Sequence, residues 1–268
     1  MQPHAKRWIT GIIAVPILFL IIAYGSERLF SLLIVLASLI GVVEYNQMVF
    51  GEGHRREKAE TLAVSLLLLA TVAGGNSHLF GALLTFAVTA ILMLNLLTIK
   101  KEGLDTGRIG KVVLGVMYVP LLMSHFLMIR QSPSGIRWIF FILVLAFSGD
   151  IAAYYVGRGL GKRKLLPEVS PGKTVEGTIG LFAGSIIGCM VFRQFFFPSL
   201  PVLHTVIMGL VGGIAGQLGD LSESALKRAA GVKDSGMLLP GHGGILDRLD
   251  CLMFIAPFIY YYRMLIVS

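Results

Sequence analysis

Charged side chains are concentrated in one short stretch of an otherwise apolar chain. This stretch, called the polar block below, runs from residue 224 to residue 250 and contains Lys227, Arg228, Lys233, Asp234, His242, Asp247, Arg248 and Asp250. Charge placed between apolar runs that meet lipid is costly, so the polar block is expected to have a chemical use. Cations beside carboxylates suit a polyphosphate and the metal ions that accompany it.

Asp220 ends an apolar run rich in glycine and alanine, just before the polar block. If a helix continues through this point, Asp220, Glu223, Ser224 and Lys227 have the i, i+3, i+4, i+7 spacing that places side chains on one face. That face presents carboxylates, a hydroxyl and an ammonium together. The same spacing also fits an ordinary amphipathic helix end with a Glu223–Lys227 ion pair, and the residues alone leave both interpretations open.

A second polar group follows the glycine-rich segment 240–245, where glycines allow a tight backbone and close approach to a ligand. Asp247 and Asp250 are three residues apart and fall on one helical face at the start of the last apolar run. Carboxylates in a first turn stabilise the helix dipole, but they also suit Mg²⁺, which takes one or two carboxylates with phosphate oxygens and water. Asp247 and Asp220 come from different segments and could share a metal ion between helices.

The segment Ser170-Pro-Gly-Lys173-Thr174 is a third candidate. It shares Gly-Lys-Thr with the phosphate-binding P-loop, but the earlier glycine and the preceding strand of that motif are missing. The backbone amides, Lys173 and Thr174 remain available to a phosphate. The basic run 162–164 has the composition of a patch beside anionic lipid. Asp150 lies in an apolar run, where an acid is either functional or paired with a lysine of the next loop.

Apolar runs close to the length of a membrane-spanning helix make up most of the chain. Of its 268 residues, 55% are hydrophobic and 14% are charged, whereas a soluble domain is about a quarter charged. A membrane-spanning helix needs about 20 apolar residues. We therefore predict an all-α polytopic membrane bundle of about nine transmembrane helices over 8–25, 29–50, 60–75, 79–99, 111–129, 137–157, 178–197, 200–219 and 245–267.

The bundle is expected to be one integrated membrane domain. In it, residues 1–130 would form scaffold helices that face lipid, and residues 131–268 would form the catalytic region. Cys189 and Cys251 lie inside predicted spans, so we interpret them as small apolar residues and not as a disulfide or a zinc site.

Lysine and arginine are distributed unevenly between the loops. With nine spans the C-terminus lies on the side opposite a cytoplasmic N-terminus, and all but five of the 23 lysines and arginines then fall on the cytoplasmic side. The exceptions are Arg28, Arg130, Arg137, Arg193 and Arg263. The positive-inside rule favours this orientation. The net charge of +8 is therefore a topology signal and not a nucleic-acid-binding surface, and the site is expected on the cytoplasmic face of the inner membrane.

The polar block as a whole resembles the signature of the phosphatidate cytidylyltransferase family, also called CDP-diacylglycerol synthases. The pattern is Ser224-x-Leu-Lys-Arg-x₄-Lys-Asp-x-Gly-x₂-Leu-Pro-x-His-Gly-Gly-Ile-x-Asp-Arg-Leu-Asp250, and every specified position is filled. Asp150 and Ser170-Pro-x-Lys-Thr-x-Glu-Gly177 resemble the family's second recurrent segment. The resemblance implies a Mg²⁺-dependent transfer of a cytidylyl group from CTP to phosphatidic acid, with release of pyrophosphate, at a site open to the cytoplasm and the inner leaflet.

Such a reaction brings two anionic phosphates together, so metal ions and fixed cations must neutralise their repulsion. We hypothesise that Asp220 and Asp247 hold the metal ion, with Asp250 and Glu223 in support and a possible second cation. Asp220, Asp247, Lys227 and Arg228 form the predicted catalytic set. The predicted substrate-binding residues are Ser170, Lys173, Thr174, Glu176, Ser222, Ser224, Lys233, Asp234, His242 and Arg248. His242 could donate to a phosphate or orient a carboxylate, and both roles stay open.

Two other functions are compatible with these residues. A CTP-dependent lipid kinase, such as a polyprenol kinase, would move the γ-phosphate to an alcohol and would need a base for that hydroxyl. An ion-coupled transporter would use intramembrane acids such as Asp150 and Asp220 as an ion path, but the predicted outer loops carry no matching polar group. The expected partners are CTP, phosphatidic acid and membrane lipids, without nucleic acid, and the spacing of small residues is compatible with a homodimer.

Overall fold

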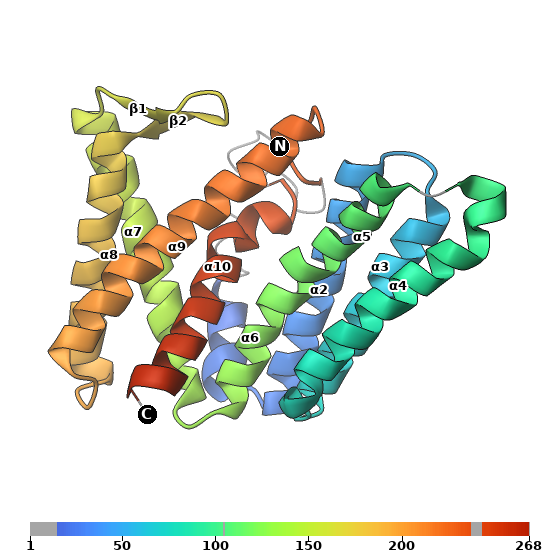
Figure 1. Cartoon of the computed structure of the whole chain (residues 1–268). Helices are drawn as coiled ribbons and strands as arrows, with labels where there is room; N and C mark the ends of the chain where they lie inside the picture. Colours follow the sequence, from blue (N-terminus) through green and yellow to red (C-terminus); the bar gives the residue numbers. More distant parts are fainter. Residues whose placement is uncertain (1–14, 104, 237–242, 268) are drawn as a thin grey trace. The chain divides into compact units, whose positions relative to one another are not determined.

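The computed structural model describes residues 15–103, 105–236 and 243–267, which are almost entirely helical (Figure 1). Packing divides the chain into two compact units. Unit 1 is the described part of Met1–Gln131 together with the described part of Asp234–Leu246. Unit 2 is Ser132–Lys233 together with the described part of Asp247–Ser268. The chain therefore leaves unit 2 after Lys233, contributes one segment to unit 1, and returns to unit 2 at Asp247.

Unit 1 is a helical bundle. After a short apolar helix, Val15–Tyr24, its elements are α2 (Glu27–Phe50), α3 (Arg55–Ala73), the 3₁₀ turn η1 (Ser77–Leu79), α4 (Phe80–Glu102), α5 (Thr106–Tyr118) and α6 (Pro120–Gln131). Helices α2, α3 and α6 pack on one another around fully buried side chains such as Tyr45 and Leu69. Asp105 starts α5, because its carboxylate accepts the N–H groups of Gly107 and Arg108 at 2.9 and 3.1 Å. The hydrogen bond from the Arg108 N–H lowers the pKa of this exposed carboxyl.

In unit 2 a β-hairpin joins two long helices at one of their ends (Figure 1). The elements are α7 (Gly135–Leu160), β1 (Lys164–Leu166), β2 (Ser170–Thr174), α8 (Val175–Phe196), α9 (Val202–Ala229), α10 (Leu246–Tyr262) and the π-helical η2 (Arg263–Val267). Helix α10 starts at Leu246, the last residue of unit 1, and continues in unit 2. The strands are antiparallel, with Lys164 opposite Thr174 and Leu166 opposite Ser170.

Small residues explain how closely α7 and α8 approach. A Cβ atom at Gly184 of α8 would overlap Ala152 and the backbone of Ser148 on α7. Small residues at helix interfaces allow such close packing in membrane proteins. Ser185 adds a hydrogen bond across the interface, since its hydroxyl donates to the Leu145 carbonyl at 3.0 Å. Helix α9 then packs against α8, so α7, α8 and α9 form the frame that holds the polar residues of unit 2.

Within the described residues, seven helices are long and apolar enough to cross a membrane. They are Glu27–Phe50, Ser77–Leu97, Thr106–Gln131, Gly135–Leu160, Val175–Phe196, Val202–Ala229 and Leu246–Val267. The prediction of a helical integral membrane protein is confirmed at this level, and the predicted count of nine is not. Two predicted spans account for the difference. The span 8–25 is described only from residue 15 and gives a short helix, whereas the span 60–75 lies in α3, whose first turns are charged.

The structure adds two features to the predicted all-α fold. The predicted span 111–129 is built from two helices that meet at Pro120, because proline has no N–H group to continue the helical hydrogen bonds. The β-hairpin corrects the prediction of a purely helical fold. Its strands have three and five residues, which is too short for an alternating apolar pattern to be visible in the sequence.

Candidate active site

The polar end of α9 presents one continuous face, as the residue spacing predicts. Helix α9 runs without interruption to Ala229, so Asp220, Glu223, Ser224 and Lys227 lie one or two turns apart. The Ser224 hydroxyl donates to the Asp220 carboxylate at 3.3 Å, and the Lys227 ammonium lies 2.5 Å from the Glu223 carboxylate. The helix end thus contains the expected Glu223–Lys227 pair.

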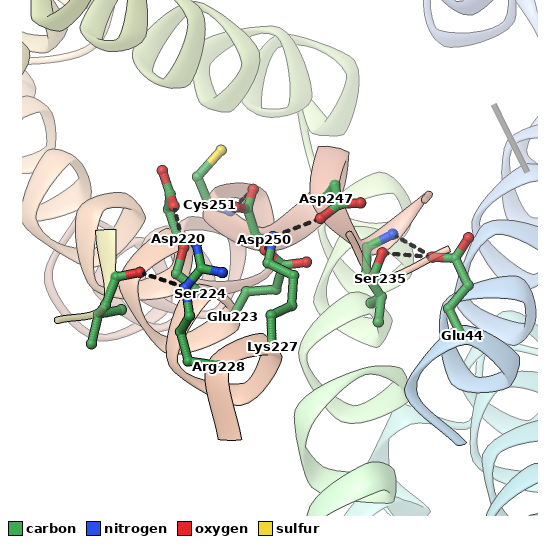
Figure 2. A network of polar contacts seen from close by, with 12 residues as sticks. Glu44, Asp220, Glu223, Ser224, Lys227, Arg228, Ser235, Asp247, Asp250 and Cys251 are labelled. Carbon is green, nitrogen blue, oxygen red and sulfur yellow. Dashed lines mark hydrogen bonds and ion pairs between the residues drawn. The ribbon is translucent and has the colours of Figure 1, made fainter. Parts of the chain in front are cut away.

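The Glu223–Lys227 pair is shielded from solvent. Glu223 is 0% exposed, and the Lys227 ammonium also lies 2.6 Å from the carboxylate of Asp247 on α10 (Figure 2). A buried charge is tolerated when an opposite charge and hydrogen bonds compensate for its desolvation. Here one ammonium lies between two carboxyl groups, one on α9 and one on α10, and so fixes the contact between these helices.

Glycine allows α10 to lie directly on α9. A Cβ atom at Gly219 would overlap the carbonyl oxygen of Asp250, so the two backbones meet where only glycine fits. The Asp250 carboxylate accepts the N–H of Cys251 at 2.7 Å. Asp220 and Asp250 therefore come from the two sides of this close contact. Cys251 is a free thiol, as is Cys189, in agreement with the prediction that neither forms a disulfide.

The β-hairpin contributes a second cation. The ammonium of Lys173 on β2 lies 2.6 Å from the Asp220 carboxylate on α9. Lys164 holds the hairpin turn by donating to the Pro171 carbonyl at 2.8 Å. The Thr174 hydroxyl accepts the Gly177 N–H at 3.0 Å and caps α8, which places Lys173 at the start of that helix. The ion pair of Lys173 is with Asp220, and the pairing of Asp150 with a lysine of this loop stays a prediction.

A cavity of about 480 Å³ lies between the hairpin and helices α7, α8 and α9. Its polar lining includes Asp150, Tyr154, Arg158, Lys173, Gln217 and Asp220. A volume of a few hundred Å³ is typical of a site for a small molecule or a headgroup. Cations and carboxylates on its wall suit a phosphate ligand with its counterions.

Sequence reasoning missed three residues that line this cavity. Tyr154 and Arg158 follow Asp150 at four-residue intervals on α7, and the Arg158 guanidinium donates to the Tyr154 hydroxyl at 3.0 Å. Gln217 lies three residues before Asp220 on α9. In each case the signal was helical spacing from an acid that had already been singled out.

The predicted metal ligands fall into two groups. Asp220 has Lys173 and Ser224 as partners, and Asp247 has Lys227. The described residues contain no group of three or more His, Cys, Asp or Glu side chains placed to hold a metal ion. A shared Asp220–Asp247 metal site therefore stays a prediction.

Other predicted residues have contacts or exposures of their own. Glu176 holds the backbone, because its carboxylate accepts the N–H groups of Lys162 and Arg163 at 3.0 and 3.2 Å. Arg228 is exposed and its Nε donates to the Val169 carbonyl at 3.3 Å. Ser170 begins β2, and Ser222 is half-buried on α9. Three more predicted substrate-binding residues are exposed: Lys233 and Arg248 in unit 2 and Asp234 in unit 1. His242 lies outside the described residues.

Comparison with known proteins gives consistent matches along the whole chain. The model of the cytidylyltransferase family matches residues 5–266. A phosphatidate cytidylyltransferase of Bacillus subtilis is 35% identical over 97% of this chain and 98% of its own length. A phosphatidate cytidylyltransferase of Synechocystis sp. is 33% identical over 98% of this chain and 97% of its own length. One of Staphylococcus epidermidis is 34% identical over 94% of this chain and 95% of its own length.

Proposed function

The chain belongs to the cytidylyltransferase family, and we propose that it transfers a cytidylyl group from CTP to phosphatidic acid, giving CDP-diacylglycerol and pyrophosphate. The resemblance in the polar block is confirmed by relatives of this name that match nearly the full length. The structural observation that carries the proposal is the Lys173–Asp220 pair at the wall of the cavity in unit 2. It provides a cation for phosphate and a carboxylate for a metal ion in one place.

The reaction is a substitution at phosphorus. An oxygen of the lipid phosphate attacks the α-phosphorus of CTP, the bond from that phosphorus to the bridging oxygen breaks, and pyrophosphate leaves. The nucleophile is already an anion, so a general base is not required. Charge repulsion between the phosphates is the main barrier, and positioned cations lower it. Lys173 and Arg158 on the cavity wall are placed to contact phosphate oxygens.

Ion pairs hold Lys173 and Lys227 in position before a substrate binds. Lys173 can exchange the Asp220 carboxylate for a phosphate oxygen, which leaves Asp220 available to a cation. Lys227 is held by two carboxylates, and in our proposal it stays with them and fixes Asp247 in the first turn of α10. Arg228 is exposed beside the hairpin residue Val169 and can contact a phosphate at the rim.

Mg²⁺ fits the donors that this site offers. Asp220, Asp247, Asp250 and Glu223 provide hard oxygen ligands, and three of them already pair with lysine ammonium groups at 2.5–2.6 Å. Mg²⁺ in nucleotide sites uses one or two carboxylates and takes its other ligands from phosphates and water, so a cluster of three protein ligands is not needed. We propose Asp220 and Asp247 as ligands, with Asp250 and Glu223 in support and room for a second cation. When bound, the ion would neutralise phosphate charge.

The membrane arrangement is part of the proposal. Nine spans, a cytoplasmic N-terminus and a C-terminus on the opposite side are supported by the asymmetry of lysine and arginine. Among the described residues seven helices meet the criteria for spans, and Val15–Tyr24 and α3 would supply the other two. The site would then face the cytoplasm from the inner membrane, within reach of a soluble nucleotide and a lipid headgroup. A homodimer is compatible with the small residues on the helix surfaces.

The deciding assay combines purified protein, CTP labelled in the cytidine, phosphatidic acid and Mg²⁺. Label in the organic phase together with equimolar pyrophosphate supports the proposal. Formation of CDP with an unlabelled phosphorylated lipid would instead identify a CTP-dependent lipid kinase. Solute counterflow in proteoliposomes without consumption of CTP would identify a transporter.

A further inference from the structure

Glu44 is a buried acid in the last third of α2, in unit 1, and is not among the residues assigned to catalysis so far. Its residue exposure is 4%, and α2 is one of the helices that are apolar enough to span a membrane. An ionisable side chain in such a helix is costly unless specific partners compensate for its desolvation. Its partners are therefore informative.

The Glu44 carboxylate binds both ends of the segment that the chain contributes to unit 1. One oxygen, Oε1, accepts the Ile245 N–H at 3.0 Å. The other, Oε2, accepts the Leu246 N–H at 3.0 Å and the Ser235 hydroxyl at 3.1 Å (Figure 2). A single carboxylate thus binds Ser235, Ile245 and Leu246 together, although nine residues lie between Ser235 and Ile245 in the sequence.

The backbone at Gly236 and Gly244 lies directly against the carboxylate. A Cβ atom at Gly236 would lie 2.5 Å from Glu44 Oε1, and a Cβ atom at Gly244 would lie 2.5 Å from Oε2. Real Cβ atoms do not approach so closely, so only glycine fits at either position without displacing Glu44. The backbone therefore packs closely against the Glu44 side chain. A loosely packed polar residue would not require glycine at these two positions.

Two of the three donors belong to the start of α10. Helix α10 begins at Leu246, and the first N–H groups of a helix have no partner within the helix. A carboxylate that accepts them both satisfies them and favours the helix dipole. The residue after Leu246 is Asp247, the proposed metal ligand, so the direction in which its side chain leaves the backbone follows from how the helix start is held.

We infer that Glu44 is a positioning residue for the reaction: it fixes the first turn of α10 and thereby orients Asp247. This inference rests on the proposed function of Asp247, whereas the contacts that support it lie within unit 1. Glu44 does not touch the substrate in this assignment. It acts through the backbone, much as outer partners orient the ligands of a metal site.

The test is Glu44→Gln, which keeps the size of the side chain but replaces one accepting oxygen with a donating NH₂ group. The donors that meet this group lose their acceptor. Amide hydrogen exchange measured by mass spectrometry should then rise about tenfold or more for Ile245 and Leu246, since each hydrogen bond to a charged group contributes more than a factor of ten. In the same protein kcat should fall about 10–100-fold and the Mg²⁺ concentration for half-maximal activity should rise, while KM for CTP changes little.

Glu57→Gln is the matched control. Glu57 lies on α3 in the same unit, has a residue exposure of 8% and pairs with Arg108 at 3.6 Å, and no contact described here joins it to residues 234–236 or 243–246. In Glu57→Gln, the amide exchange rates at Ile245 and Leu246 should equal those of the wild-type protein. The Mg²⁺ dependence of activity should also be unchanged. Gly236→Ala is a second variant that leaves Glu44 in place and displaces its carboxylate sterically. It should reproduce the pattern of Glu44→Gln, and it serves if Glu44→Gln does not fold.

Three results would overturn the inference. The first is an amide exchange rate at Ile245 and Leu246 that equals the wild-type rate in a folded Glu44→Gln protein. Where that variant does not fold, the same result in Gly236→Ala counts. The second is an increase in exchange spread evenly along α2, which would indicate a general loss of packing. The third is unchanged kcat and Mg²⁺ dependence despite faster exchange at the helix start. Failure of the proposed function is separate, because the wild-type protein would then make no CDP-diacylglycerol while the exchange measurement would still report on the anchor.

Discussion

The ammonium of Lys227 lies 2.6 Å from the carboxylate of Asp247, and this ion pair joins the polar end of α9 to the first turn of α10. Glu223 lies 2.5 Å from the same ammonium and is fully buried. One cation therefore balances two carboxylates. The arrangement holds Asp247 in place, where we propose that a metal ion binds.

Replacing Lys227 with methionine should be costly for stability as well as activity. It leaves Glu223 and Asp247 without their shared cation, and removing one partner of a buried ion pair costs about 3–5 kcal/mol. The free energy of unfolding in detergent, followed by circular dichroism, measures this loss. Adding Glu223→Gln to Lys227→Met removes one unbalanced charge and should recover part of the stability without restoring turnover. Equal stability of the wild-type and Lys227→Met proteins would show that the buried group is not formed.

Asp220→Asn and Asp247→Asn should each reduce turnover by about 10²–10⁴-fold, the usual effect of losing a group that stabilises charge in the transition state. The amide keeps the size of the carboxyl group but is a poor ligand for a hard cation. Initial rates of CDP-diacylglycerol formation measure the loss, and the amount of protein extracted from membranes checks that each variant inserts. Near-normal rates in both variants would contradict the metal assignment.

Lys173→Ala should raise KM for CTP or phosphatidic acid and lower kcat/KM by about 10²-fold, because it removes a cation from the cavity wall. Lys162→Ala is the matched control, since Lys162 is exposed and contacts Glu176 through its backbone N–H alone among the interactions described. Its rate should stay within about twofold of the wild-type rate, as expected for a surface change. A similar loss in both variants would mean that only the overall positive charge of this loop matters.

Glu176→Gln separates a structural role from substrate binding. The carboxylate of Glu176 accepts hydrogen bonds from the backbone N–H groups of Lys162 and Arg163. Replacing it with the glutamine amide should therefore loosen the loop that leads into β1. Faster amide exchange across residues 162–174 with less than about a tenfold loss of kcat fits the loss of hydrogen bonds of this kind. A large rise in KM for CTP without faster exchange would instead restore Glu176 as a substrate ligand.

Removal of divalent cations should abolish turnover reversibly. A chelator takes away the charge that the site would use to neutralise phosphate, and added Mg²⁺ should restore the rate. Asp250→Asn should shift the Mg²⁺ concentration for half-maximal activity by less than Asp247→Asn does, since Asp250 is assigned a supporting role. Full activity of metal-free protein would contradict the Mg²⁺ proposal, whatever the effect of the aspartate variants.

Residue spacing predicted the polar face of α9 because a helix imposes a fixed period on its side chains. The face from Asp220 to Lys227 and the helical start at Asp247 follow from that period alone. The family resemblance added the substrates, which no spacing rule supplies. The apolar runs predicted most membrane spans, but they missed the break at Pro120 and the charged first turns of α3.

Contacts between distant segments could not be predicted in the same way. Lys173 pairs with Asp220 and Lys227 with Asp247 because the helices bring these groups together, and a single sequence offers several other pairings with equal chemistry. Glu44 illustrates the limit most clearly. It stands alone in an apolar run, and its partners lie about 200 residues further along the chain.

The path of the chain between the two units has a consequence for protein engineering. Residues 234–246 are assigned to unit 1, and their described ends contact Glu44, although the chain on either side of them belongs to unit 2. A chimaera between two relatives that is joined at residue 131 would take α2 from one protein and Gly236 and Gly244 from the other. The backbone at these glycines would then meet an α2 to which it is not fitted. Grafts that move residues 234–246 together with the first 131 residues should preserve the fit, whereas a fragment of residues 132–268 would keep every proposed metal ligand and lose the acid that holds the start of their last helix.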